Sequence, residues 1–387
     1  MSKPDELYIG LMSGTSIDGI DVALVQFVES QPTLLHFYNH PINAELKTQL
    51  AEISSPLVKR GSDSKNRVEQ LAKLDNMMGQ VFAEAVIQLL RIHHIDPSNI
   101  IAIGSHGQTV RHRPNNAQPF TLQIGDPSII AEKTQITTIA DFRRMDVAAG
   151  GQGAPLAPAF HNGVLRSNQE DRIILNLGGI ANITYLAKDK NTRVLGFDTG
   201  PANTLLDAWF KKHHPESKDD FDRNSQLAQQ GKVNSPLLIK LLDDPYFSQD
   251  YPKSTGREYF SLDWLENNIQ CVEQSLSNPK IKIEDVQRTL LELTLKSITD
   301  AINGLSIDHY QVFVCGGGMH NHYLMKLLSD KLKTRVQKTN DLSVDGDYLE
   351  AMTFAWLAKR RIEKLPGNLP SVTGASKEKI LGAIYLP

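Results

Sequence analysis

The first half of the chain is organised by short hydrophobic runs and one long amphipathic stretch. Residues 7–12, 20–28 and 33–38 are short apolar runs rich in β-branched and aromatic side chains, which are typical of strands. Residues 67–93 carry apolar side chains at helical spacing instead, and another strand-like run follows at 100–106. Strands followed by a helix and further strands predict an α/β sheet.

The second half of the chain repeats this order. Two strand-like runs, 172–177 and 180–187, flank a Gly178–Gly179 turn, as the first two runs of the chain flank a turn at 13–19. Helical patterns follow, and then a strand at 310–315 that leads into three glycines. No repeat is visible at the level of residue identity, so the similarity of the halves rests on element order and turn position.

Length and charge narrow the class of protein. The chain has 387 residues, 40% of them hydrophobic, and a net charge of −3. Single hydrophobic cores stop growing at about 250–300 residues, so the length predicts two lobes with a cleft between them. The balanced charge gives no reason to expect nucleic acid or an anionic membrane as a partner.

Cysteine usage and the N-terminus bear on the compartment. Only Cys271 and Cys315 occur, far apart and without neighbours at metal-ligand spacing, so we expect no disulfide framework. Lys, Pro, Asp and Glu precede the first apolar run, unlike a signal peptide, and no run of about 18 apolar residues is present. These features predict a reduced, cytoplasmic protein.

The turn after the first strand is the densest chemical signal. Gly, Ser and Thr residues join two hydrophobic strands there, so backbone N–H groups and hydroxyls gather at a hairpin tip, which could bind phosphate. An ordinary hairpin whose Gly and Ser serve turn geometry explains the composition equally well. The candidate phosphate-binding residues are Gly14, Thr15, Ser16, Ile17, Asp18, Gly19, Ile20 and Asp21.

Two further glycine turns complete a candidate nucleotide site. Gly178 and Gly179 form the matching turn of the second half, and two such turns in two lobes would face each other across a cleft. Gly316, Gly317 and Gly318, with Asn321, stand between a strand and a helix, where flat backbone lets a planar group such as adenine lie close. A tight strand-to-helix turn explains the three glycines equally well.

Several long motifs resemble one family. They are GLMSGTSIDGID at 10–21, SHGQTV at 105–110, DFRRMDVAAGGQGAPL at 141–156, NLGGIANIT at 176–184, GFDTGPANTLLDAW at 196–209, CGGGMHN at 315–321 and the C-terminal LGAIYLP. In this order they closely resemble the anhydro-N-acetylmuramic acid kinases, over nearly the whole chain. The resemblance implies the actin-like, Hsp70-like and sugar-kinase fold: two α/β lobes, each a mixed sheet flanked by helices, around a nucleotide cleft.

The resemblance also implies how the chain is divided. Residues 1–168 would form the N-terminal lobe with the first phosphate hairpin. Residues 169–363 would form the C-terminal lobe with the second hairpin and the adenosine motif, and 364–387 a tail that packs back on the lobes. No residue is assigned to magnesium, because Leu11 stands where many members of the wider superfamily carry Asp.

Asp198 matches the position that the family uses as its catalytic base. A carboxylate at the end of a strand and the start of a helix would be held rigidly at the floor of a cleft. The alternative is a helix N-cap, for which Asp is well suited. Thr199 or Asn203 could take that role instead, so we favour catalysis.

The family resemblance suggests further sugar contacts. Glu350 stands three residues after Asp347, a spacing that equally fits a capping box. Arg143 could bind a carboxylate or lactyl group bidentately, although a surface ion pair with Asp146 is the alternative. The candidate substrate-binding residues are His106, Gln108, Arg143, Asp146, Gly200, Asn203 and Glu350.

The resemblance implies a kinase that uses ATP and Mg²⁺. It would open 1,6-anhydro-N-acetylmuramic acid with water and phosphorylate O6, giving N-acetylmuramic acid 6-phosphate in the recycling of cell-wall peptidoglycan. A homodimer is compatible with this role. The alternatives are a kinase for another sugar or small acid on the same fold, and a nucleotide-switched binding module like Hsp70.

Overall fold

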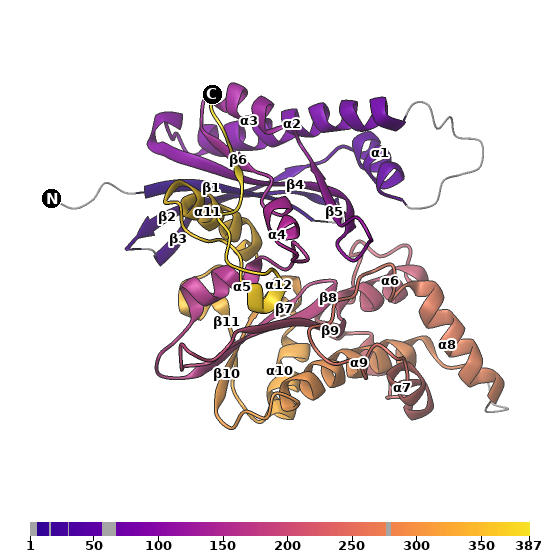
Figure 1. Ribbon diagram of the computed structural model, residues 1–387. Coiled ribbons are helices and arrows are strands. Elements are labelled where there is room, and N and C mark those ends of the chain that lie inside the picture. Colours follow the sequence, from indigo (N-terminus) through magenta and orange to yellow (C-terminus); the bar gives the residue numbers. More distant parts are fainter. Residues whose placement is uncertain (1–5, 15–16, 30, 56–66, 276–279) are drawn as a thin grey trace. The chain divides into compact units, whose positions relative to one another are not determined.

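The computed structural model describes residues 6–14, 17–29, 31–55, 67–275 and 280–387. The chain divides into two compact units (Figure 1). Unit 1 consists of Met1–Leu165 together with Tyr348–Pro387, and unit 2 consists of Arg166–Asp347. Each unit is built on its own mixed β-sheet.

The sheet of unit 1 has a path of strands in the order β12-β6-β4-β1-β2-β3, with β5 paired to β4. The hairpin pairs β1–β2 and β2–β3 are antiparallel, whereas β1–β4 and β4–β6 are parallel. The strands are β1 (Glu6–Ser13), β2 (Gly19–Val28), β3 (Gln31–Pro41), β4 (Ile100–Arg113), β5 (Phe120–Ile124), β6 (Thr138–Ala140) and β12 (Ala383–Tyr385).

Helices cover both faces of this sheet (Figure 1). On β1, Ile9 and Leu11 join the core that includes Leu74, Met78 and Phe82 of α2, whereas Gly10 faces α11, because successive strand residues point to opposite faces. The helices are α1 (Ala44–Ser54), α2 (Arg67–Ile92), α3 (Pro127–Thr134), α4 (Arg144–Ala148), α5 (Ala157–Phe160), α11 (Leu349–Ile362) and α12 (Pro370–Thr373).

The sheet of unit 2 has the strand order β11-β10-β7-β8-β9. Its two hairpin pairs are antiparallel and its two remaining pairs are parallel, which is the same sequence of senses as β6-β4-β1-β2-β3 in unit 1. The duplicated topology confirms the predicted fold class and the predicted echo between the halves. The strands are β7 (Asp171–Leu177), β8 (Ile180–Leu186), β9 (Leu195–Pro201), β10 (Tyr310–Cys315) and β11 (Val336–Lys338).

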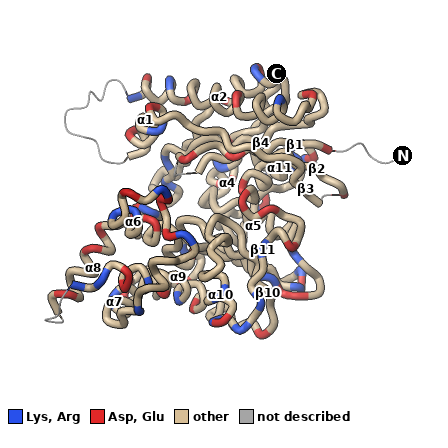
Figure 2. The backbone as a smooth tube through the Cα atoms, turned by 180° about the vertical axis from the view of Figure 1, so that it is seen from behind, with Lys and Arg blue, Asp and Glu red and all other residues tan. Residues whose placement is uncertain are grey.

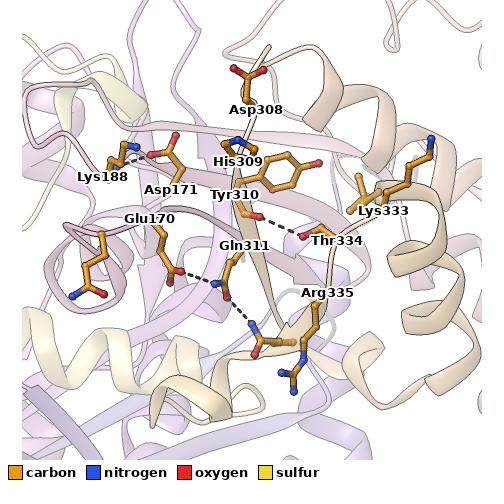
Figure 3. A pocket seen from close by; sticks show the side chains of 13 residues that line it. Glu170, Asp171, Lys188, Asp308, His309, Tyr310, Gln311, Lys333, Thr334 and Arg335 are labelled. Atoms are coloured by element: carbon orange, nitrogen blue, oxygen red, sulfur yellow. Dashed lines mark hydrogen bonds between the residues drawn. The ribbon is translucent and has the colours of Figure 1, made fainter.

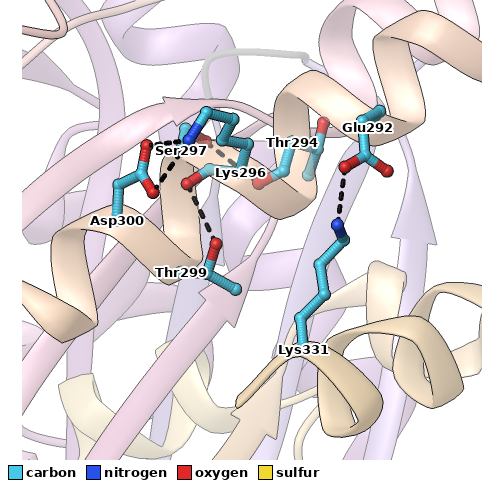
Figure 4. A network of polar contacts seen from close by, with 7 residues as sticks. All are labelled: Glu292, Thr294, Lys296, Ser297, Thr299, Asp300 and Lys331. Atoms are coloured by element: carbon cyan, nitrogen blue, oxygen red, sulfur yellow. Dashed lines mark hydrogen bonds and ion pairs between the residues drawn. The ribbon is translucent and has the colours of Figure 1, made fainter. Parts of the chain in front are cut away.

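Long amphipathic helices complete unit 2. The buried side of α9 supplies Leu290, Leu291 and Ile298 to the core, and its outer side carries the ion pair Lys296–Asp300 at 2.9 Å. Glu292 of α9 pairs at 2.6 Å with Lys331 of the neighbouring helix α10 (Figure 4). The helices are α6 (Asn203–His213), α7 (Ser235–Leu242), α8 (Leu262–Ser275), α9 (Ile283–Asn303) and α10 (His322–Leu332).

The observed division of the chain differs from the predicted boundary at residue 363. Helix α11 belongs to unit 1, because it packs against β1, β2 and β4. The last strand, β12, also joins the sheet of unit 1 by pairing with β6. The C-terminal forty residues therefore return to the first unit. The sequence predicts a returning tail over 364–387 alone and leaves 348–363 in the C-terminal lobe.

Charge is dispersed over both units. Lys and Arg are interspersed with Asp and Glu in each of them (Figure 2). Cys271 and Cys315 are not joined in a disulfide. Among the helices that the structure describes, each is too short or too polar to cross a membrane.

Candidate functional site

The first glycine turn lies at the β1–β2 hairpin, as predicted. The Ile17 amide donates to the Gly14 carbonyl at 3.1 Å, and Ile17 adopts a left-handed conformation with φ of 57°. Gln108 of β4 holds the base of the turn: Ser13 Oγ donates to its Oε1 at 2.7 Å, and its Nε2 donates to the Gly14 carbonyl at 3.3 Å. Thr15 and Ser16 lie outside the described residues.

The far side of this turn joins β2. Ile20 is fully buried in the core of unit 1, so it supports the turn through its side chain. Asp18 pairs with Lys47 at 3.1 Å, and Asp21 accepts a hydrogen bond from Asn39 at 2.7 Å. Both carboxylates therefore stand beside the turn with a partner already in place.

His106 and Arg143 form a direct contact in unit 1. Arg143 donates from Nε at 3.0 Å to His106 Nε2, and its Nη2 lies 2.8 Å from the same atom. Nε2 must then be the acceptor, so the proton of the neutral ring is on Nδ1. Burial, and then the Arg143 charge, lower the pKa of His106 well below its usual value. Burial also lowers the pKa of Arg143, to about 10, which leaves it cationic at neutral pH.

Glu350 lies in the first turn of α11. The helix has Tyr348 as its N-cap without a side-chain cap bond, and Asp347 instead contacts His320 at 2.8 Å. The Asp347 amide donates to Asp345 Oδ1 at 2.9 Å and not to Glu350, so the capping-box alternative is not what the structure contains. The Glu350 side chain is exposed, yet desolvation by the surrounding protein raises its pKa, while the Arg143 charge opposes this shift and Asp21 adds to it.

Asp146 differs from both of its sequence-based interpretations. Its side chain is fully buried and accepts hydrogen bonds from the Gly153 amide at 2.7 Å, Asn368 Nδ2 at 2.6 Å and Thr373 Oγ1 at 2.8 Å. It therefore ties the segment after α4 to the C-terminal segment around α12. Because these donors occupy both carboxylate oxygens, Asp146 has a structural role here and is not in a surface ion pair.

The second glycine turn joins β7 and β8 in unit 2, as predicted. Its carbonyls receive the first amides of α6: Asn203 N donates to Gly178 at 3.1 Å, and Thr204 N donates to Gly179 at 3.1 Å. A Cβ on Gly179 would lie 2.6 Å from Thr204 Oγ1 and 2.9 Å from Arg257 Nε. The turn is therefore covered closely by a hydroxyl and a guanidinium group, which only glycine allows.

The third glycine cluster borders a cavity of about 700 Å³ within unit 2. Asn321 caps α10 by accepting from the Leu324 amide at 3.1 Å, and its Nδ2 donates to Ser225 Oγ at 2.8 Å. The cavity is lined by Asn203, Leu206, Asp207, Phe221, Asp222, Arg223, Asn224, Ser225, Gln287, Gly317, Gly318, His320, Asn321 and His322.

The three consecutive glycines have different surroundings. A Cβ on Gly316 would overlap Asn176 Oδ1, and Gly316 has a φ of 79°. A Cβ on Gly318 would lie 2.6 Å from Leu177 Cβ, whereas a Cβ on Gly317 would meet nothing within 4 Å. Gly316 and Gly318 are thus needed for packing, and Gly317 alone leaves open space beside the cavity.

Asp198 lies on β9 of unit 2. Its Oδ2 accepts from the Thr255 amide at 2.9 Å and from Ser254 Oγ at 3.0 Å, and its carbonyl oxygen accepts from Tyr246 Oη at 2.7 Å. Its Oδ1 accepts no hydrogen bond from a described residue. Burial raises the pKa of Asp198, and the bonds from Thr255 and Ser254 oppose the shift. Because Asp198 does not cap α6, the N-cap alternative is not what the structure contains.

The remaining predicted sugar contacts, Asn203 and Gly200, belong to unit 2. Asn203 lines the cavity beside Gly317 and Gly318, and its Nδ2 donates to the Leu177 carbonyl at 3.1 Å. Gly200 is buried, and a Cβ there would lie 2.9 Å from Phe247. Asn203 therefore lies beside the predicted nucleotide-binding residues. Gly200 has a packing role, because it lets Phe247 approach the backbone of β9.

Sequence reasoning missed the segment from Lys253 to Arg257. Its Ser254 and Thr255 hold Asp198, and Arg257 stands at the Gly179 turn. It also missed Asp207, whose pKa burial raises to about 7, against the nearby Arg257 charge. The signal was the short Ser-Thr-Gly-Arg sequence at 254–257, whose composition is that of an ordinary loop.

A second cavity, of about 650 Å³, lies among β7, β10 and β11 and contains none of the predicted site residues (Figure 3). Its polar groups satisfy one another: Gln311 Nε2 donates to Glu170 Oε2 at 2.5 Å, and Gln337 Nε2 donates to Gln311 Oε1 at 2.8 Å. Positive and negative side chains both line it, so its charge favours no ligand class.

Metal-ligand clusters are absent from the part of the chain that the structure describes, where no three His, Cys, Asp or Glu side chains converge. A cation bound chiefly through nucleotide phosphates does not require such a cluster, because Mg²⁺ in phosphoryl-transfer sites uses one or two carboxylates.

Comparison with known proteins agrees with these features. The family model described as anhydro-N-acetylmuramic acid kinase matches residues 6–387. Proteins of that name are 49% identical in Coxiella burnetii (strain RSA 493 / Nine Mile phase I), over 99% of this chain and 98% of that protein, and 47% identical in Pasteurella multocida (strain Pm70), over 100% and 98%. A third, from Shewanella denitrificans, is 49% identical over 100% of this chain and 99% of that protein. The chain belongs to the anhydro-N-acetylmuramic acid kinase family.

Proposed function

We propose that the protein is an ATP-dependent kinase that opens 1,6-anhydro-N-acetylmuramic acid with water and phosphorylates its O6. The product is N-acetylmuramic acid 6-phosphate, an intermediate of cell-wall recycling. Family membership supports the substrate, and the two glycine turns with the cavity at Gly317 support the nucleotide. The observation that carries the chemistry is the Asp198 carboxylate, held by Oδ2 with Oδ1 left available.

Asp198 acts as the general base in this reaction. It removes a proton from the water that attacks the anomeric carbon, and the bond from that carbon to O6 breaks. The released O6 attacks the γ-phosphorus of ATP, and ADP leaves. A pKa raised by burial makes the carboxylate a stronger base than an ordinary Asp, which favours proton transfer.

The phosphates of ATP contact the two glycine turns, and Arg257 supplies a positive charge beside Gly179. Positioning and electrostatic stabilisation provide most of the catalysis in phosphoryl transfer. The adenosine lies in the cavity bordered by Gly317, Gly318 and Asn321. Mg²⁺ would neutralise phosphate charge, with Asp18 and Asp21 as the carboxylates that stand beside the first turn.

The anhydro sugar contacts the polar cluster of unit 1. Arg143 is a cation that can bind the lactyl carboxylate, and the neutral His106 is fixed against it. Glu350 and Gln108 supply acceptors and donors for sugar hydroxyls and the N-acetyl group. Asp146 supports this cluster indirectly, by holding the segment that accepts from Arg143 through the Gly153 carbonyl at 2.8 Å.

The test follows an oxygen isotope. The full chain is incubated with ATP, Mg²⁺, the anhydro sugar and ¹⁸O-water, and the product is examined by mass spectrometry. Label at the anomeric oxygen, with one phosphate gained, is the expected result. Unlabelled product would contradict hydrolytic opening, and faster phosphorylation of a free sugar would favour the ordinary sugar-kinase alternative.

Two further properties belong to the same proposal. We expect a cytoplasmic enzyme, because ATP and the recycled sugar meet there, and a homodimer is compatible with the role. ATP hydrolysis that is independent of every sugar tested would favour the nucleotide-switched binding module instead.

A further inference from the structure

Gln287 is a buried polar side chain that the proposed chemistry does not use. It lies near the start of α9, is fully buried and lines the cavity beside Gly317. Its Nε2 donates to the Leu206 carbonyl at 3.3 Å. Its Oε1 is buried and accepts no hydrogen bond from a described residue.

The orientation of this amide is determined by its neighbour. Rotating the amide by 180° would place Oε1 against the Leu206 carbonyl oxygen, so two acceptors would meet. The atom of the amide that bonds to Leu206 is therefore Nε2, and the atom left without a partner is the acceptor Oε1. A buried acceptor without a partner destabilises the fold, so a ligand that supplies an N–H to it gains affinity.

The rest of the cavity fits a flat, partly apolar group. Leu206 and Phe221 supply apolar walls, and the Arg223 guanidinium lies 5.5 Å from the centre of the Phe221 ring. Gly317 adds a backbone wall without a side chain. Asp207 lines the same cavity and is a second acceptor when ionised.

We propose that Gln287 Oε1 reads the exocyclic amino group of the nucleobase, so that the cavity selects a 6-aminopurine over a 6-oxopurine. The inference rests on the proposed nucleotide site and adds the residue that determines base specificity. Adenine offers an N–H donor at position 6, whereas hypoxanthine and guanine offer a carbonyl oxygen there. That oxygen would meet Oε1 and leave both acceptors unpaired, and a site built for a hydrogen bond rejects such analogues strongly.

The experiment compares ATP with ITP, which differs in that group. Dissociation constants and kcat/KM are measured for both nucleotides with the wild-type chain, Gln287→Met and Gln287→Leu. We expect the wild type to prefer ATP. In both variants the ratio of ATP affinity to ITP affinity should fall about tenfold, chiefly because ATP binds more weakly. Gln337→Met, in the other cavity of unit 2, is the matched control and keeps the wild-type ratio.

The ratio separates specificity from a folding defect, because a general loss of structure weakens both nucleotides together. A wild-type chain without preference between ATP and ITP would overturn the assignment, and so would variants that keep the wild-type ratio. These outcomes leave the kinase proposal intact. A folded wild-type chain that binds neither nucleotide would overturn the kinase proposal itself.

Discussion

Gly10 of β1 and Gly104 of β4 are partners in the parallel register, and both lie directly beneath α11. A Cβ on Gly10 would overlap the Ala351 carbonyl oxygen, and a Cβ on Gly104 would overlap the Phe354 carbonyl oxygen. The two glycines thus let the helix backbone approach the strands. This approach determines where Glu350, in the first turn of α11, is held.

We expect Gly10→Ala to destabilise unit 1 strongly. The methyl group would meet backbone atoms, which cannot rotate away as a side chain can, so the cost should be about 1–3 kcal/mol or more. Thermal unfolding measures the effect. Gly317→Ala is the control, because a Cβ there meets nothing within 4 Å, and it should keep the wild-type melting temperature. Equal melting temperatures for the two variants would contradict the close packing of α11.

Asp198→Asn should remove turnover while ATP still binds. The amide oxygen can accept the bonds from Ser254 and Thr255, so the shape of the site is retained, but the amide cannot take up a proton. Loss of a general base should lower kcat by at least ~10²–10⁴. Steady-state kinetics and calorimetry with ATP provide the two measurements. Near-normal turnover by the folded variant would rule out Asp198 as the base.

Ser254→Ala tests whether the hydrogen bond from Ser254 lowers the pKa of Asp198. The Ser254 hydroxyl donates to the ionised carboxylate and lowers its pKa, so its removal should raise the pKa further. Because the base acts only when it is ionised, the acidic limb of the kcat/KM profile should move to higher pH. Activity well above that limb should change less. A pH profile that keeps its acidic limb would show that Ser254 does not tune the base.

The leading hairpin of each sheet was predictable because local signals in the sequence indicate it, whereas the order of the remaining strands was not. Hydrophobic runs separated by glycine turns indicated the β1–β2 and β7–β8 hairpins, and the structure contains both. Local patterns could not show that α11 packs in unit 1, because that depends on Gly10 and Gly104, far away in sequence. They also could not show that the Asp146 carboxylate accepts hydrogen bonds from Asn368 and Thr373, since those partners lie more than two hundred residues later.

Gly317→Val should weaken nucleotide binding without unfolding the protein. The added side chain meets no protein atom at its Cβ, so it occupies space beside the cavity that we assign to adenosine. Calorimetry should show at least tenfold weaker ATP binding, which corresponds to about 1.4 kcal/mol. The melting temperature without nucleotide should stay close to that of the wild type. Unchanged ATP affinity would place the adenosine elsewhere.

Asp207→Asn should stabilise the protein at high pH. Burial, opposed by Arg257 and reinforced by Asp220 and Asp222, raises the pKa of Asp207 to about 7. The folded state therefore holds this proton more tightly than the unfolded state, in which Asp titrates near 3.9. Stability from the protonated form is fully present below that value and is lost as pH rises toward about 7.

The amide of the variant has no charge to bury, so the gain in melting temperature of Asp207→Asn over the wild type should grow between pH 4 and pH 7 and stay level above it. Thermal unfolding without nucleotide, across pH 4 to 8, measures this difference. Asp300→Asn is the comparison, because Asp300 pairs with Lys296 at the surface, its side chain is 55% exposed and its charge is not among those that shift the pKa of Asp207. If the difference in melting temperature between Asp207→Asn and the wild type did not vary with pH, the Asp207 carboxyl would be ionised throughout. The Arg257 charge would then offset the cost of burying it.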